Sequence, residues 1–249
     1  KRAVAEMSAY VASLETVEAT YLAEAEEKFE SSLAETLTNL TADYSSWKSA
    51  RPSSVKSVEG TEFRAETNGI VQTTGPHPNQ DDYHYSLEAT DLPPRLTGWK
   101  LEVFPHPDHT DGKLGRGPAG EFVLTNVKLF ARRKGQSQVR EIEMRGAVAD
   151  FQREIKGTGY GPVKDTLNDD PRNGWTTESG DPRKTHTAVF ELTDALVPDP
   201  DEELVFVLCH RSTDGDANIG RFRLSLTSEV GETVRGIGPS PLEEAAKRK

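Results

Sequence analysis

The residues best placed for chemistry in this sequence lie in three long polar segments, residues 105–120, 156–184 and 211–219. Loops of this length are uncommon in compact domains unless they serve a function. A sugar site needs an aromatic ring to pack against C–H faces, with charged or amide side chains that fix the hydroxyls. Trp175 and Tyr160 are the best aromatic candidates, because both lie in the second polar segment, near Asn173. The alternative is that Trp175 closes one end of a β-sandwich core.

Acidic clusters in the same segments offer the oxygen ligands that calcium prefers. One candidate is the stretch Asp165–Asn173. A second, Asp214–Asn218, has the alternating ligands of a calcium loop but lacks its glycine and glutamate, and a hairpin turn explains it equally well. His106 and His109 are potential transition-metal ligands without an evident third partner. We expect no required cofactor, and a structural Ca²⁺ is the one metal that these patterns favour.

No set of residues predicts catalysis. We find no Ser/His/Asp set, no carboxylate pair with separated pKa values and no phosphate-binding glycine loop, because Gly115–Pro118 precedes a predicted strand. Cys209 lies in an apolar run, which predicts a buried and inert thiol, and without a Cys-x-x-Cys-His motif no haem attaches to this chain. The sequence therefore predicts a non-enzymatic protein. A hydrolase would need two carboxylates facing each other across a cleft within ~10 Å.

Composition and net charge limit the classes of partner that the protein can bind. The 249 residues are 34% hydrophobic and 29% charged, which supports a packed core with a very polar surface. A formal net charge of -11 disfavours nucleic acid and anionic lipid. No apolar run approaches the ~20 residues of a membrane span, so we expect no membrane insertion. The chain begins at Lys1, and we expect it to be part of a larger protein.

The elements that must position these residues differ along the chain. From Val4 to Trp47 large apolar residues recur at helical spacing without Pro or Gly, which predicts one amphipathic helix over residues 1–50, ended by Arg51-Pro52. Such a helix typically serves as a coiled-coil strut or arm, and a partner-binding helix is the alternative. Residues 234–249 form a linker and the start of a second helix, because Ser240 begins a capping box. The two helices would pair, with the β domain inserted between them.

Residues 51–233 predict a β domain. Short segments rich in β-branched and aromatic residues alternate with turn residues, and alternation such as that of Tyr83, Tyr85 and Leu87 gives one core face and one wet face. Strands without intervening helices favour two packed antiparallel sheets. We predict a mainly β, two-sheet jelly-roll sandwich preceded by one long α-helix, with Trp99 in its core.

Several segments together resemble a domain of large planctomycete cytochrome-type proteins, in which it follows an N-terminal haem-binding domain. The resemblance covers roughly residues 47–227 and rests on the order and spacing of short motifs. These motifs are Arg51-Pro52-Ser53-Ser54-Val55, Asp81-Asp82-Tyr83, Leu101-Glu102-Val103-Phe104-Pro105, Gly115-Arg116-Gly117-Pro118-Ala119-Gly120-Glu121-Phe122-Val123-Leu124-Thr125, Asn173-Gly174-Trp175, His186-Thr187-Ala188-Val189-Phe190 and Gly220-Arg221-Phe222-Arg223-Leu224-Ser225.

The resemblance implies a galactose-binding-like sandwich, similar to coagulation-factor type C domains and carbohydrate-binding modules. It implies a structural calcium near Asp165, Asp169 and Asp170, Trp175 near the rim, and a location outside the cytoplasm. The family has asparagine where this chain has Glu121, so a role for that position is not carried over.

We therefore predict a non-catalytic polysaccharide-binding module within a larger cytochrome-type protein, with a shallow site formed by Trp175, Tyr160, Arg116 and His109. The alternative is a structural or protein-interaction domain that packs on other domains of the parent protein and binds no sugar. An aromatic ring on a concave surface would favour the first hypothesis, and a buried Trp175 the second.

Overall fold

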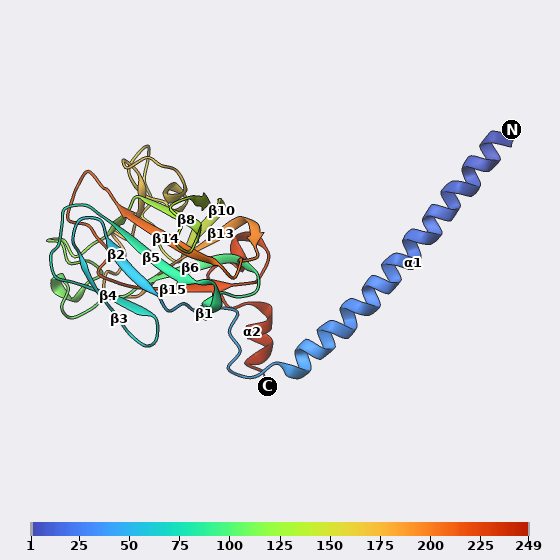
Figure 1. Cartoon of the computed structure of the whole chain (residues 1–249), viewed down its shortest axis with the longest axis horizontal. Coiled ribbons are helices and arrows are strands. Elements are labelled where there is room, and N and C mark those ends of the chain that lie inside the picture. Colours follow the sequence, from blue (N-terminus) through green and yellow to red (C-terminus); the bar gives the residue numbers. More distant parts are fainter. Residues whose placement is uncertain (1, 249) are drawn as a thin grey trace. The chain divides into compact units, whose positions relative to one another are not determined.

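The computed structural model describes residues 2–248, which divide into two compact units (Figure 1). Residues Ser46–Gly238 form the β unit. The segments on either side of it, up to Ser45 and from Pro239, form the other. The β unit therefore extends beyond the predicted boundaries of 51 and 233 at both ends.

Two antiparallel sheets make up most of the β unit, which confirms the predicted mainly β, two-sheet fold. Sheet A has the order β10 (Met144–Ala149), β13 (His186–Leu196), β6 (Leu96–Val103), β15 (Arg221–Thr227), β4 (Ile70–Thr74) and β3 (Glu62–Ala65), and β1 (Lys48–Ser49) also pairs with β15. Sheet B has the order β2 (Ser54–Ser57), β5 (Asp81–Glu88), β14 (Glu202–His210), β8 (Asn126–Arg133) and β9 (Val139–Glu141). Jelly-roll connectivity stays a prediction.

A small third sheet and four 3₁₀ turns complete the β unit. In the third sheet, β12 (Gly174–Thr176) lies between β11 (Tyr160–Gly161), to which it is parallel, and β7 (Val123–Leu124), to which it is antiparallel. The turns are η1 (Ala89–Asp91), η2 (Thr110–Gly112), η3 (Val163–Leu167) and η4 (Glu232–Arg235).

Aromatic side chains join the two sheets. Trp99 of sheet A is fully buried, as predicted, and stacks on Phe190 with ring centroids 4.2 Å apart. It also meets Phe206 of sheet B edge-on at 5.3 Å, and Tyr85 of sheet B lies 6.2 Å from Phe222 of sheet A. Because these rings carry much of the apolar area of the core, they fix the separation of the layers.

The long helix is confirmed, but its predicted end at residue 50 is wrong. Helix α1 spans Arg2–Asn39, and Tyr44 and Trp47 follow it although they share the helical spacing. Asn39, Thr41 and Asp43 favour turns because their side chains compete for backbone hydrogen bonds, and the N–H of Tyr44 donates to Thr41 O. Lys48–Ser49 then joins sheet A beside β15 instead of continuing a helix.

The predicted capping box is present. The N–H of Glu243 donates to Ser240 Oγ, and the Glu243 carboxylate accepts from the N–H of Ser240, at the start of α2 (Pro241–Ala246). Ser45 Oγ also donates to Glu243 Oε1 (3.0 Å), so α2 lies beside the segment that follows α1. Within residues 2–248, neither helix has both the length and the hydropathy needed to cross a bilayer.

Candidate functional site

Trp175 is a core residue, so the prediction that it forms an exposed sugar platform is wrong. Its side chain on β12 is fully buried, and its ring meets Phe122 edge-on with centroids 5.0 Å apart. Its indole N–H donates to Phe151 O at 2.9 Å. A ring enclosed in this way has no face left for a sugar, and the alternative reading of Trp175 as a plug of the core describes it correctly.

His109 and Arg116 are also held by the fold. His109 is buried, with Nδ1 2.9 Å from Lys113 O and Nε2 2.9 Å from the Gln72 amide nitrogen. Burial lowers its pKa, so it is neutral, and Nδ1–H donates to Lys113 O. The half-buried Arg116 guanidinium donates to three backbone carbonyls of residues 74–76. Both side chains organise the first polar loop and leave few groups for a ligand.

Tyr160 joins the second and third polar loops. Its hydroxyl donates to Pro171 O at 2.9 Å and accepts from the N–H of Thr213 at 2.8 Å. β11 places Tyr160 opposite Gly174, one residue from Trp175, but the hydroxyl points into a backbone network. The structure therefore places Trp175 in the core and uses His109, Arg116 and Tyr160 to hold the polar loops together.

The carboxylates of two predicted calcium ligands, Asp169 and Asp170, pair with basic side chains, whereas the backbone oxygens of Asp165 and Asp170 both lie 3.1 Å from the side-chain amide of Asn173. Asp169 Oδ2 lies 3.1 Å from Lys128 Nζ, and both Asp170 oxygens accept from the Arg172 guanidinium at 2.8–2.9 Å. Arg172 lowers the pKa of Asp170 to about 2. Asp165 lies on η3. Within residues 2–248 no three His, Cys, Asp or Glu side chains are arranged to hold a metal ion.

The third polar loop differs from the predicted hairpin. Residues 211–219 connect β14 of sheet B to β15 of sheet A, so the loop crosses between the layers. Asn218 Nδ2 donates to Pro78 O at 2.7 Å, which fixes the loop against residues 76–80.

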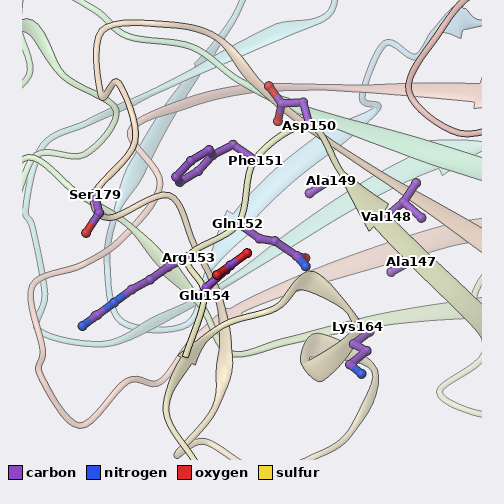
Figure 2. A pocket seen from close by; sticks show the side chains of 10 residues that line it. All are labelled: Ala147, Val148, Ala149, Asp150, Phe151, Gln152, Arg153, Glu154, Lys164 and Ser179. Carbon is purple, nitrogen blue, oxygen red and sulfur yellow. The ribbon is translucent and has the colours of Figure 1, made fainter. Parts of the chain in front are cut away.

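An open groove of about 730 Å³ lies at the β10 edge of sheet A (Figure 2). One wall is the strand segment Ala147–Ala149, and the floor is the extended segment 150–154 that follows it. Lys164 of η3 and Ser179 complete the rim. The sequence places Lys164 and Ser179 in the second polar segment but does not reveal the groove, because its lining comes from segments distant in sequence.

Side chains alternate along the floor of the groove. Figure 2 shows Phe151 and Arg153 extending towards the side of Ser179, whereas Gln152 extends towards β10. Gln152 Oε1 accepts from the N–H of Val163 at 3.0 Å, which leaves its amide N–H groups for a ligand. Arg153 pairs with Glu178. The groove thus combines an aromatic ring with amide and charged groups.

A pair formed by His186 and Asp150 holds the first residue of the groove segment 150–154 in place. His186 is buried, and its Nδ1 lies 3.2 Å from Asp150 Oδ2 while its Nε2 lies 2.9 Å from Asp181 O. Since both ring nitrogens face acceptors, the doubly protonated imidazolium fits this site best. The hydrogen bond to Asp150 raises the pKa of His186 despite burial. Burial acts to raise the pKa of Asp150, but hydrogen bonds from His186 and the N–H of Thr187 hold it below its usual value.

This pair predicts a loss of stability in mild alkali. Because the folded pKa of His186 lies above its unfolded value of about 6.5, its contribution is complete below that pH and is lost as pH rises through the folded pKa. We expect His186→Asn to cost about 1–2 kcal/mol of unfolding free energy at pH 6 and less at pH 9. Urea titrations at both pH values measure this cost in unfolding free energy. The control is His84→Asn, at a half-buried position of β5. An equal cost at both pH values would contradict the imidazolium.

Comparison of this chain with protein-family models and with curated proteins found no significant match, so the family resemblance stays an expectation.

Proposed function

We propose that this protein is a non-catalytic polysaccharide-binding module and that its sugar site is the groove beside β10. The observation that carries the proposal is Phe151, a half-buried ring that lines an open groove beside Gln152 and Arg153. Aromatic rings pack on sugar C–H faces, and amide and charged groups bind hydroxyls. The proposal keeps the predicted ligand class and replaces the predicted residues.

The carboxylates of the groove favour binding over hydrolysis. A glycosidase needs one carboxylic acid with a raised pKa opposite a second carboxylate. Asp150 and Glu154 both line the groove, but both Asp150 oxygens accept hydrogen bonds and its pKa is lowered. Burial raises the pKa of Glu121, which is not among the residues that line the groove.

The family resemblance supplies the setting of this proposal. It suggests that the module belongs to a larger cytochrome-type protein outside the cytoplasm, with a structural Ca²⁺ in the parent family. Binding of a polymer by an open groove would then hold such a protein on its substrate matrix.

Affinity electrophoresis against neutral and sulfated polysaccharides tests the proposal. We expect retardation by at least one polymer, and we expect Phe151→Leu, which keeps the apolar packing but removes the ring, to weaken binding about tenfold. Lys164→Gln should weaken binding of sulfated polymers in particular, whereas Lys56→Gln, at an exposed position of β2, should not. No retardation by any polymer would overturn the function. Retardation that Phe151→Leu and Lys164→Gln leave unchanged would overturn the site.

A structural or protein-interaction domain is the second candidate function. The burial of Trp175 favours it, as does a row of exposed apolar side chains along α1. If no polysaccharide binds, this candidate takes precedence.

A further inference from the structure

Helix α1 exposes an apolar stripe. Ten large apolar side chains of the described helix are at least 37% exposed, namely Met7, Tyr10, Val11, Leu14, Val17, Tyr21, Leu22, Phe29, Leu33 and Leu37. At 3.6 residues per turn, Val11, Leu14, Leu22, Phe29 and Leu33 fall on one face of the helix. Exposed apolar side chains gathered on one face of a helix mark an interaction site.

Helix α1 carries a large net negative charge. Its sequence contains eight glutamates but only two basic residues, Arg2 and Lys28, an excess of six negative charges. Two glutamates interrupt the stripe itself. Glu18 lies four residues from both Leu14 and Leu22, and Glu26 lies four residues after Leu22 and three before Phe29.

These glutamates decide which partner fits. A second α1 aligned in parallel would place Glu18 against Glu18 and Glu26 against Glu26 in a low-dielectric seam, where like charges are destabilising. A carboxylate in such a seam instead requires a cation that reaches over the apolar contact. Lysine and arginine do this with long apolar stems that pack beside the seam.

We propose that α1 is a docking helix for a basic amphipathic helix, whose apolar residues pack on the stripe and whose Lys or Arg side chains pair with Glu18 and Glu26. This surface is independent of the β10 groove. Opposite charges at the flanks of paired helices set partner choice in coiled coils, and here they select a partner of opposite sign.

Two synthetic helical peptides test the proposal with the full chain. Both carry leucines at coiled-coil seam positions, and they differ in having lysine or glutamate at every flanking position. Titration calorimetry should detect binding of the lysine peptide, weaker at high salt, and at least about tenfold weaker binding of the glutamate peptide. Analytical ultracentrifugation of the chain alone should show no self-association through α1.

Variants in α1 separate apolar docking from charge selection. Phe29→Glu should abolish binding of the lysine peptide, and Ser31→Glu should not, because position 31 lies on the opposite side of the helix although it adds the same charge. Glu18→Lys with Glu26→Lys should reverse the preference in favour of the glutamate peptide. The proposal is overturned if neither peptide binds, if both bind equally, if the double charge reversal leaves the preference unchanged, or if α1 self-associates and Phe29→Glu abolishes that association.

Discussion

Replacing Trp175 by alanine is expected to lower the unfolding free energy by about 3–5 kcal/mol, the usual cost of removing a fully buried large aromatic side chain. The change removes the contact with Phe122 and leaves Phe151 O without the indole donor. Urea denaturation followed by far-ultraviolet circular dichroism measures the loss. A residue that served only as a sugar platform on the surface would cost well under 1 kcal/mol.

A second substitution, Trp175→Phe, separates the loss of the aromatic ring from the loss of the hydrogen bond. It retains an aromatic ring in the cavity but cannot donate to Phe151 O, so we expect it to cost less than the alanine variant. If Trp175→Ala folds with unchanged stability, the indole is not buried, and the original sugar-platform interpretation returns. Loss of polysaccharide binding in this variant would in any case reflect the fold, because Trp175 supports the carbonyl of a groove residue.

Replacing Asp81 by alanine is expected to cost about 3 kcal/mol, because four donors, one of them the buried hydroxyl of Thr61, lose a shared buried acceptor together. The buried carboxylate accepts from the hydroxyls of Ser57 and Thr61 and from the N–H groups of Val58 and Glu59. Burial opposes its ionisation, but these hydrogen bonds outweigh burial and hold the pKa of Asp81 below its ordinary value. The carboxylate thus fastens the turn after β2 to the start of β5.

The pH dependence of this effect has a definite sign. The lowered pKa means that the stability from Asp81 is present above the unfolded value of about 3.9 and is lost as pH falls through the folded pKa. The advantage of the wild-type chain over Asp81→Asn should therefore be full at pH 6 and shrink in acid. Asp169→Asn, at an exposed carboxylate, is the control and should change little. An advantage that grows in acid would contradict the assignment.

The sheets were predictable because their signals are local. Tyr83, Tyr85 and Leu87 alternate with polar residues, and all three are buried in sheet B. Phe222 and Leu224 follow the same rule in sheet A. In such strands the period of two alone decides which side chains enter the core. The short strands β1, β11 and β12 escaped prediction, because two or three residues carry no period.

The end of α1 was less predictable. Leu40, Tyr44 and Trp47 continue the helical spacing, yet the helix ends at Asn39. Periodicity reports where apolar side chains recur, whereas Lys48 and Ser49 gain partners in β15 only once the sheet exists. Tertiary pairing of this kind overrides local propensity.

The candidate site was the least predictable part. A tryptophan between Gly174 and Thr176 in a polar segment looks exposed, but the third sheet that encloses it is built from pairings between distant short strands. Nothing in the spacing of Phe151 and Gln152 distinguishes residues that line a groove from those of an ordinary sheet edge. These residues line a surface groove only because β10 is an edge strand of sheet A.

The place of β15 in sheet A has a consequence for synthesis of the chain. This strand comes last in sequence but lies between β6 and β4 and also carries β1. A nascent polypeptide that has passed His210 can complete sheet B, while β6 and β4 still present open hydrogen-bonding edges to solvent or to a chaperone. Residues 221–227 must therefore emerge from the ribosome before the second layer closes, so sheet A is completed only after every other strand of the domain has been synthesised.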